Sequence, residues 1–266
     1  MIAGSLKDKT VLITGGSGGI GFELAKLFLK EEARLILVAS RKEKLEAAGA
    51  FLQKEFKTRP VLIAKDLSKP SAPWEIFSEL SDKKISVDVL VNNAGVGVYG
   101  ELEKMDPDRL LQMVDLNIRS VVALTRFFTP SMVQRGSGGI LNVASTAAFQ
   151  AIPREAVYAA SKTFVLHFSE ALAEELRGSG VSVTCLCPGP TDTDFFGDDK
   201  MRLSAALRKN MMKSDDVARA GFEALKRGDR IAVPGLVNKV VKALAKLAPR
   251  KWATKIAGRV VKSWEL

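Results

Sequence analysis

The segment Tyr158-Ala-Ala-Ser-Lys162 carries a phenol and an ammonium group four residues apart. Apolar residues continue at helical spacing through Leu166, Ala171 and Leu176, so both side chains are expected on one face of a helix. A nearby ammonium favours the phenolate and lowers the pKa of a tyrosine, which suits Tyr158 to exchange a proton with a substrate oxygen. Tyr and Lys at this spacing are also common on helix surfaces, so the pair needs support from the rest of the chain.

A glycine-rich run, Thr14-Gly-Gly-Ser-Gly-Gly-Ile-Gly21, joins an apolar segment to a helical pattern. Glycines let the backbone turn tightly and approach a pyrophosphate, and the free N–H groups at a helix start favour an anion. A literal G-x-G-x-x-G passes through Gly16, Gly18 and Gly21, and the spacing Gly15, Gly19, Gly21 fits as well. The run predicts a dinucleotide phosphate site; a glycine-rich turn without a ligand is the alternative.

The stretch Val38-Ala-Ser-Arg-Lys42, about 20 residues further on, has no carboxylate. Folds that use NAD normally carry an acidic residue there to hold the ribose 2′-hydroxyl. Ser40, Arg41 and Lys42 instead offer a hydroxyl and two cations that suit a 2′-phosphate. The stretch therefore predicts NADP(H), unless the two cations are only the solvated first turn of a helix.

Short apolar runs rich in Val, Ile and Leu alternate with helical patterns along the chain. They are apolar at nearly every position, as expected for parallel strands covered on both faces. Repeated strand-helix-strand units predict an α/β fold with a doubly wound sheet and ligands at the carboxyl ends of the strands. The expected strands are residues 10–14, 34–38, 60–64, 87–91, 139–143, 181–186 and 230–233.

The composition of the 266 residues is ordinary for a globular protein, with 47% hydrophobic and 26% charged residues. It excludes disordered, collagen-like and disulfide-scaffold classes. Cys185 and Cys187 are interpreted as buried thiols, and neither they nor Asp192 and Asp194 have enough companions for a metal site. Without an N-terminal apolar signal or a spanning apolar segment, a cytoplasmic protein is expected.

Further motifs appear in order: Asn92-Asn-Ala-Gly95, Asn117, Ser145 and Pro188-Gly189. With the glycine run and the Tyr-Lys pair they resemble the short-chain dehydrogenase/reductase family over about residues 6 to 235. The resemblance implies a Rossmann-type sheet of about seven parallel strands flanked by helices. It also implies a catalytic tetrad in which Tyr exchanges the proton, Ser holds the carbonyl oxygen, Lys binds the nicotinamide ribose and lowers the Tyr pKa, and Asn retains a relay water; the matching residues are Asn117, Ser145, Tyr158 and Lys162.

The resemblance also selects Gly15, Gly19 and Gly21 among the glycines and places Asp66 against adenine, with Asn92 and Gly95 along the cofactor. Thr191 and Thr193 would hold the carboxamide and a nearby phosphate. Thr191 is expected to act through its backbone, because the family often has Ile or Val there. The cofactor residues expected in full are Gly15, Ser17, Gly19, Ile20, Gly21, Ser40, Arg41, Asp66, Leu67, Asn93, Ala94, Gly95, Tyr158, Lys162, Pro188, Gly189, Thr191 and Thr193.

The segment after Thr193, about residues 194–213, occupies the place of the family's substrate lid and is rich in Phe, Leu and Met. With Ile152 facing it, the pocket would be apolar and suit a hydrophobic ketone, an acyl thioester or a steroid-like carbonyl. A helix packed on the core is the alternative for this segment. The expected substrate residues are Ser145, Ala147, Phe149, Phe195 and Phe196.

The last 41 residues hold 11 basic and 2 acidic side chains and thus +9 of the net charge of +10. Residues 236–248 form a basic amphipathic pattern, and a second follows Pro249. Such helices can lie on an anionic membrane surface. They can also pack on the enzyme or at a subunit interface, whereas nucleic acid is not expected because no stacking platform or known module is present.

These patterns together predict one catalytic domain over residues 1–235 and a helical extension over 236–266. The expected activity is an NADP(H)-dependent carbonyl reductase or alcohol dehydrogenase for an apolar substrate, working as a homo-oligomer. The alternative is a non-catalytic NADP(H)-binding regulatory protein that engages a membrane or a partner through its tail. Retention of all four tetrad residue types argues for the enzyme.

Overall fold

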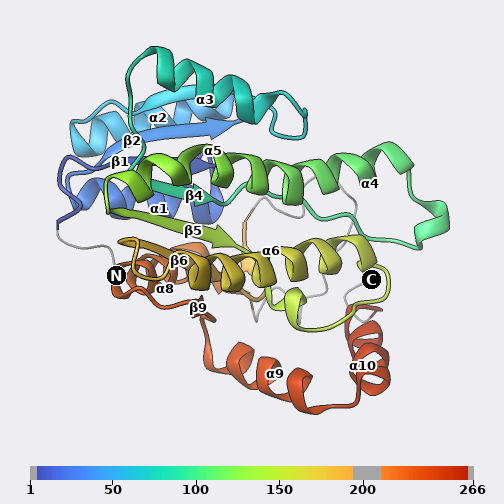
Figure 1. Ribbon diagram of the computed structural model, residues 1–266. Coiled ribbons are helices and arrows are strands. Elements are labelled where there is room, and N and C mark those ends of the chain that lie inside the picture. The colour runs from blue at the N-terminus through green and yellow to red at the C-terminus, as the bar shows by residue number, and fades with distance from the viewer. Residues whose placement is uncertain (1–4, 194–210, 263–266) are drawn as a thin grey trace.

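A seven-stranded parallel sheet forms the centre of the molecule in the computed structural model, which describes residues 5–193 and 211–262 (Figure 1). Its strand order is β3-β2-β1-β4-β5-β6-β9. All seven predicted strands are confirmed with ends within two residues: β1 Thr10–Thr14, β2 Arg34–Ala39, β3 Val61–Ala64, β4 Val89–Asn92, β5 Gly138–Val143, β6 Val181–Leu186 and β9 Ile231–Ala232.

The chain reverses its direction of travel across the sheet between β1 and β4. Leu12 of β1 is in register with Ile36 of β2 on one side and with Leu90 of β4 on the other. The strands beyond β2 and β4 are added outward in opposite directions, so the crevice at the carboxyl ends of β1 and β4 is a topological switch point. Ligands of doubly wound sheets bind at such a crevice.

Two layers of helices cover the sheet. On one face lie α1 Gly19–Lys30, α2 Lys42–Phe56 and α8 Ser214–Arg227, and on the other lie α3 Ala72–Asp82, α5 Ser120–Gln134 and α6 Ala156–Glu175. Shorter helical segments follow β4 and β5: η1 Leu102–Lys104, α4 Pro107–Val114, η2 Asp115–Arg119 and η3 Thr146–Phe149. The described residues also include a two-stranded sheet that the sequence did not predict, β7 Thr191–Asp192 with β8 Met212–Lys213.

Residue types at the helix ends explain several of these boundaries. Asp106 caps α4 by accepting a hydrogen bond from the Asp108 N–H at 2.9 Å, and Pro107 occupies the first helical position. Helix α8 has two aspartates in its first turn and ends at Gly228, which adopts a left-handed φ of +77°.

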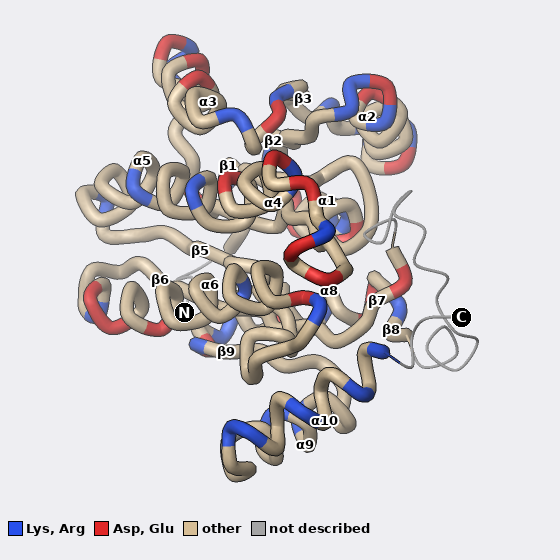
Figure 2. The backbone as a smooth tube through the Cα atoms, turned by 90° about the vertical axis from the view of Figure 1, so that its right-hand side faces the viewer, with Lys and Arg blue, Asp and Glu red and all other residues tan. Residues whose placement is uncertain are grey.

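The last two helices, α9 Leu236–Leu247 and α10 Arg250–Lys262, lie outside the two layers, below β9 and α6 in Figure 1. Helix α9 contacts η3, and α10 buries Ala257 and Val261 against a small cluster that includes Ile152. In Figure 2 the backbone of both helices is coloured for Lys and Arg at several positions and for Asp or Glu at none. The two amphipathic helices predicted from the sequence are confirmed, and none of the described helices is long and apolar enough to cross a bilayer.

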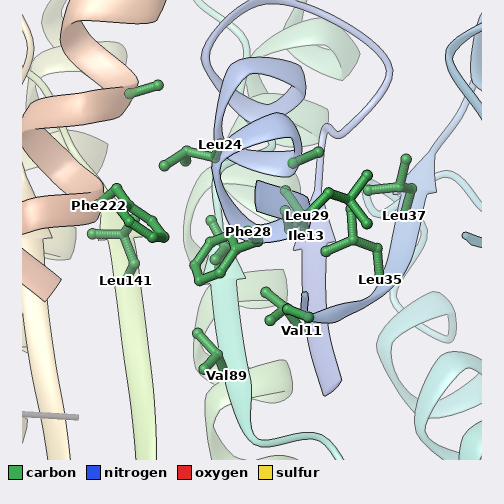
Figure 3. Packing of buried hydrophobic residues seen from close by; sticks show 14 of the residues in the cluster. Val11, Ile13, Leu24, Phe28, Leu29, Leu35, Leu37, Val89, Leu141 and Phe222 are labelled. Atoms are coloured by element: carbon green, nitrogen blue, oxygen red, sulfur yellow. The ribbon is translucent and has the colours of Figure 1, made fainter. Parts of the chain in front are cut away.

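The larger core lies between the sheet and the α1, α2 and α8 layer (Figure 3). The rings of Phe28 from α1 and Phe222 from α8 meet edge to face with centroids 5.0 Å apart, above Val11, Ile13 and Leu141. Alternate strand residues such as Leu12, Ile36 and Leu90 point to the other face and pack against α3 and α5. This double burial explains why the strands read as continuous apolar runs.

Cys185 and Cys187 are both free thiols with no exposed surface. Their sulfur atoms lie 3.8 Å apart, at and just beyond the end of β6. The hydrogen bond with Cys185 and burial both raise the pKa of the Cys187 thiol. Since both sulfurs are buried, they are packing groups, as the sequence predicted.

Candidate active site

A cavity of about 690 Å³ runs along the carboxyl ends of the strands. The glycine loop after β1 and the end of β2 line one end of it. Ser145, Tyr158 and Lys162 line its middle, and residues of α9 and α10 line the other end. The cavity therefore joins the nucleotide motifs to the proton-transfer motifs of the sequence.

The glycine loop has the backbone that a phosphate site requires. Gly15 and Gly19 adopt left-handed φ values of +66° and +52°, and a Cβ on Gly21 would lie 2.4 Å from the Gly15 carbonyl oxygen. Gly18, by contrast, has open space around it and an extended φ of −175°. The structure thus favours the spacing Gly15, Gly19, Gly21 over Gly16, Gly18, Gly21.

Helix α1 begins directly after this loop, and its N-cap residue is Gly18, which has no side chain that could accept a hydrogen bond from the first turn. The N–H groups of the first turn are therefore available to an anion in the cavity, which Ser17, Gly19 and Ile20 also line. The glycine loop lies beside a long cavity and leads into the first turn of a helix. This arrangement fits the pyrophosphate of a dinucleotide.

Asn93 ties the end of β4 to the glycine loop. Its side-chain amide donates hydrogen bonds to the carbonyl oxygens of Thr14, at 2.9 Å, and Gly15, at 3.2 Å. The Thr14 hydroxyl in turn accepts from the N–H groups of Asn93 and Ala94, both at 3.0 Å. Asn93, Ala94 and Gly95 line the cavity as expected.

Asn92 differs from the expectation that it lies along the cofactor. Its buried side chain donates to the Asn142 side-chain oxygen at 2.8 Å and to the Thr125 hydroxyl at 3.1 Å, and it is not part of the cavity wall. Asn142 donates onward to Ser169 of α6 at 2.9 Å. Because neighbouring strand residues point to opposite faces of a sheet, Asn92 joins β4, β5 and the helix layer instead.

The end of β2 provides the expected cationic group. Ser40 and Arg41 line the cavity, and the Arg41 side chain has no hydrogen-bond or ion-pair partner among the described residues. Lys42 does not line the cavity and pairs with Glu46 at 3.9 Å on the surface of α2. Lys44, which the sequence interpretation missed, does line it; its position three residues after Arg41 on a helix was the available signal.

Asp66 and Leu67 also line this end of the cavity. Asp66 accepts hydrogen bonds from the Ser68 N–H and hydroxyl at 3.0 and 2.8 Å, which fixes the turn after β3. The cavity is also lined by Pro188, Gly189, Thr191 and Thr193, and a Cβ on Gly19 would lie 2.9 Å from the Thr193 Cγ2. The Thr191 hydroxyl donates to the Gly189 carbonyl oxygen at 2.8 Å, so it is used within its own loop, consistent with a backbone role.

Helix α6 presents Tyr158 and Lys162 to the cavity on one face, with the Lys162 Nζ 5.8 Å from the centroid of the Tyr158 ring. Ser145, at the end of β5, is hydrogen-bonded to Tyr158 and accepts from the Ala147 N–H at 3.1 Å. Lys162 is buried and donates to the Val143 carbonyl oxygen at 3.0 Å. Three of the four tetrad residues thus meet at one place.

Asn117 lies behind the cavity wall, in the π-helical turn η2. Its side chain accepts from the Val96 N–H at 3.0 Å, and donates to the Val96 carbonyl oxygen at 2.9 Å and to Ser161 of α6 at 3.1 Å. A Cβ on Gly95 would lie 3.2 Å from both the Asn117 Oδ1 and the Lys162 Nζ. The side chain of Asn117 therefore fixes the backbone beside Lys162.

The pKa of Tyr158 differs from the sequence expectation, which was that the Lys162 ammonium lowers it. Burial raises the pKa of Tyr158, and the hydrogen bond from Ser145 lowers it only in part. The cost of removing a phenolate from water therefore exceeds the gain from its neighbours, and no lowering by Lys162 is seen. Burial also lowers the pKa of Lys162 to about 8.

Glu155 is a cavity residue that the sequence interpretation missed. It immediately precedes α6, lies one turn before Tyr158, and its carboxyl group has no hydrogen-bond partner among the described residues. Burial raises its pKa to about 7. The spacing Glu155, Tyr158, Lys162 on one helical face was the signal that could have found it.

The substrate end is only partly as expected. Ala147 and Ile152 line the cavity, but Phe149 does not: its ring lies under the Lys242 ammonium, 5.4 Å from the centroid, and against the cluster around Cys185. Phe195 and Phe196, with most of the expected lid, lie outside the described residues. The apolar wall that the structure describes comes from α9 and α10, through Val241, Leu244, Ala245, Ala248, Ala253, Ile256, Ala257, Val260 and Val261.

A metal centre has no counterpart in the part of the chain that the structure describes. No group of three or more His, Cys, Asp or Glu residues there is arranged to hold a metal ion.

A family model and a search for related sequences point to the same family. The family model described as short chain dehydrogenase matches residues 9–202. The chain is 30% identical over 243 residues to the ketoacyl reductase HetN of Nostoc sp., which covers 91% of this chain and 84% of that protein.

Solved structures show the same architecture. A short-chain dehydrogenase from Sphingobium yanoikuyae in complex with NADPH is 27% identical, with a TM-score of 0.79 over 91% of this chain and 96% of that one. The bulky-bulky ketone specific alcohol dehydrogenase from Comamonas testosteroni is 25% identical, with a TM-score of 0.75 over 91% and 95%. At 23% identity and a TM-score of 0.81, covering 91% and 94%, a dehydrogenase/reductase from Burkholderia phymatum in complex with NAD shares the fold.

Proposed function

Because the chain belongs to the short chain dehydrogenase family and is an oxidoreductase acting on CH–OH groups, we propose that it interconverts an apolar ketone or ketoacyl carbonyl and the secondary alcohol with NADP(H). The observation that carries this proposal is the shared cavity. Ser145, Tyr158 and Lys162 line the same space as the glycine loop, so a bound dinucleotide and a carbonyl would meet beside the phenol.

The chain's own residues supply the proton and the orientation. When bound, the nicotinamide supplies or accepts a hydride at the carbonyl carbon. In reduction Tyr158 donates its hydroxyl proton to the carbonyl oxygen as that oxygen gains negative charge, and Ser145 donates a hydrogen bond to the same oxygen. The raised pKa of Tyr158 suits this direction, because it keeps the proton on the phenol until the oxygen becomes basic.

Lys162 and Asn117 have supporting roles. The Lys162 ammonium lies beside the phenol ring and would hold the nicotinamide ribose, and its buried position makes it a fixed donor. Asn117 is a positioning residue: through Val96 and Ser161 it holds the loop and the helix between which Lys162 extends.

The preference for NADP(H) rests on the end of β2. Ser40, Arg41 and Lys44 line the cavity there, and β2 ends at Ala39 where an NAD enzyme would carry a carboxylate. A guanidinium without another partner in residues 5–193 and 211–262 suits a 2′-phosphate. The NADPH complex of the Sphingobium relative agrees with this assignment.

An apolar substrate is favoured by the far end of the cavity. Its walls are Ala147 and Ile152 on one side and the aliphatic side chains of α9 and α10 on the other. The relatives that act on ketoacyl groups and on bulky ketones fit such a space. Residues 236–266 are thus proposed as an extension that completes the substrate end of a catalytic domain spanning 1–235.

The proposed enzyme is a cytoplasmic homo-oligomer that does not bind nucleic acid. Members of this family commonly form oligomers through their long helices, and Val122 and Val133 on α5 and Phe164 on α6 are apolar side chains left at the surface. The regulatory alternative receives no support from the relatives, which are reductases and dehydrogenases.

Tyr158→Phe tests the proposal, because it removes the proton donor and keeps the ring. We expect NADPH oxidation with bulky ketones and ketoacyl thioesters to fall by about 10²- to 10⁴-fold, the usual contribution of a general acid. NADPH binding, followed by fluorescence, should change little. Turnover that survives the substitution, or no turnover by the parent protein on any carbonyl, would overturn the proposal.

A further inference from the structure

The apolar face of α9 is turned outward. Leu236, Val240 and Leu247 are 78%, 50% and 83% exposed, whereas the partly buried positions of the helix include Asn238 and Lys242. An amphipathic helix that only covered its own core would show the opposite arrangement. The outward face therefore has no cover within the described chain.

Helix α10 continues this surface. Ala257 and Val261 anchor the helix to the domain, while Trp252, Ile256 and Val260 form an exposed stripe at four-residue spacing, with Trp252 62% exposed. We call the exposed apolar side chains of the two helices the hairpin face; they are Leu236, Val237, Val240, Val241, Leu244, Leu247, Trp252, Ile256 and Val260. This amount of apolar surface on two adjoining helices marks an interaction site.

The charge on the two helices selects among the possible partners. Residues 236–262 contain eight lysines and arginines and no acidic residue (Figure 2). If two copies of the chain met through this surface, positive charge would face positive charge. An anionic surface that also accepts apolar side chains satisfies both features, and a bilayer with anionic lipids is such a surface.

The hairpin face is continuous with the cavity. Val241, Leu244, Ile256 and Val260 line the cavity and are also at least a third exposed to solvent, so they form its rim. The apolar end of the cavity therefore opens on the exposed hairpin face. Tyr158 and Ser145 lie further along the same space.

We propose that the hairpin face docks on an anionic membrane and that lipid-dissolved carbonyl substrates enter the cavity from the bilayer between α9 and α10. This proposal rests on the proposed function for the identity of the substrate, whereas the docking itself does not depend on turnover. Exposed cations such as Lys239 and Lys251 would contact lipid phosphates, and the apolar side chains would enter the boundary between headgroups and acyl chains.

Vesicle sedimentation of the full-length protein tests the docking. The parent protein should sediment with vesicles of phosphatidylcholine and phosphatidylglycerol, and far less with phosphatidylcholine alone, because the cations require lipid charge. Val240→Glu/Leu247→Glu places two charges on the hairpin face away from the cavity and should lower the partition coefficient by about tenfold or more. Phe51→Glu is the matched control: its side chain is 50% exposed on α2 at the other edge of the sheet, and its binding should equal that of the parent.

A second variant covers loss of folding in the first. Lys239→Glu/Lys251→Glu changes only exposed cations and should also release the protein from the anionic vesicles. The proposal is overturned if the parent protein stays in solution, if both variants sediment like the parent, or if Val240→Glu/Leu247→Glu splits an oligomer and thereby identifies a second copy as the occupant. The proposal is also overturned if an acidic protein occupies the hairpin face and anionic vesicles do not displace it.

Turnover separates substrate entry from docking. With a long-chain ketone dissolved in the vesicles, NADPH oxidation by Val240→Glu/Leu247→Glu should fall in parallel with binding, while its rate with a short water-soluble ketone should equal that of the parent. Equal rates on both ketones would refute entry from the bilayer. No rate in any protein would instead refute the proposed function and leave the sedimentation result to decide the docking.

Discussion

The side chain of Asn238 on α9 lies directly against the backbone of Gly189, and both residues line the cavity. A Cβ on Gly189 would be 2.5 Å from the Asn238 Oδ1 and 2.8 Å from its Cγ. Asn238 also donates to the Pro234 carbonyl oxygen at 2.8 Å, which holds the start of α9. The C-terminal helices are thus joined to the loop that would carry the cofactor's carboxamide.

Gly189→Ala should destabilise this junction by about 1 to 3 kcal/mol, since the added methyl group overpacks against Asn238. In an Asn238→Ala background the same change should cost much less, because the obstructing side chain is gone. Denaturant unfolding of the parent, both single variants and the double variant measures the coupling. Additive costs would show that the two residues do not interact.

Gly21→Ala should cost far more stability than Gly18→Ala, although the two glycines are only three residues apart. The Gly21 Cβ would lie 2.4 Å from a backbone oxygen that cannot move aside, so we expect a loss of at least about 2 kcal/mol of stability. Gly18 has open space and an extended backbone, so alanine there should change the stability by less than about 1 kcal/mol, because the lower entropy of the unfolded chain and the poorer N-cap of alanine act in opposite directions. Unfolding without cofactor is the measurement, and equal losses would contradict the assigned glycine pattern.

Arg41→Ala should raise the Kd for NADPH by about 10- to 100-fold, the value of a charge-assisted hydrogen bond to phosphate. The Kd for NADH should change little, because NADH lacks the 2′-phosphate. Lys42→Ala is the matched control, since the Lys42 ammonium pairs with Glu46 outside the cavity. An equal loss of affinity for both cofactors would place Arg41 elsewhere than at the 2′-phosphate.

Glu155→Gln should remove a pH-dependent weakness of the fold. The folded-state pKa of Glu155 is raised from its ordinary 4.5 to about 7 by burial, so between these pH values the unfolded chain releases the proton first and stability falls as pH rises. The difference in Tm between variant and parent should therefore increase by a few degrees from about pH 5 to about pH 8. Glu103→Gln, at an exposed position, should show no such trend. A difference that is constant with pH would rule out a buried Glu155 carboxyl group.

The strands could be predicted because strands that are buried on both faces have an apolar residue at nearly every position, as at Val11, Leu12 and Ile13. The pair β7 and β8 was not, since two residues each are too few to form a pattern. The side chain of Asn92 was placed wrongly because the motif gives its position in the chain but not the face of the sheet to which it points.

The candidate site divides in the same way. The glycines, Ser145, Tyr158 and Lys162 have fixed spacing within one loop or helix, which the sequence records. The apolar wall from α9 and the burial of the Glu155 carboxyl group depend on how distant segments meet. The amphipathic pattern of residues 236–248 predicted an apolar helix face but not which part of the molecule that face would contact. Phe149 was expected in the substrate pocket, but its ring turns toward Lys242.

The two thiols at the end of β6 make it possible to measure how often the centre of the sheet opens. They are the only cysteines of the chain, and neither has any exposed surface. A maleimide or disulfide reagent can reach them only when β6 separates from α6 or from its neighbouring strands, so the labelling rate counts those openings. Ligands that fill the cavity beside Lys162 should lower this labelling rate, although they contact neither sulfur.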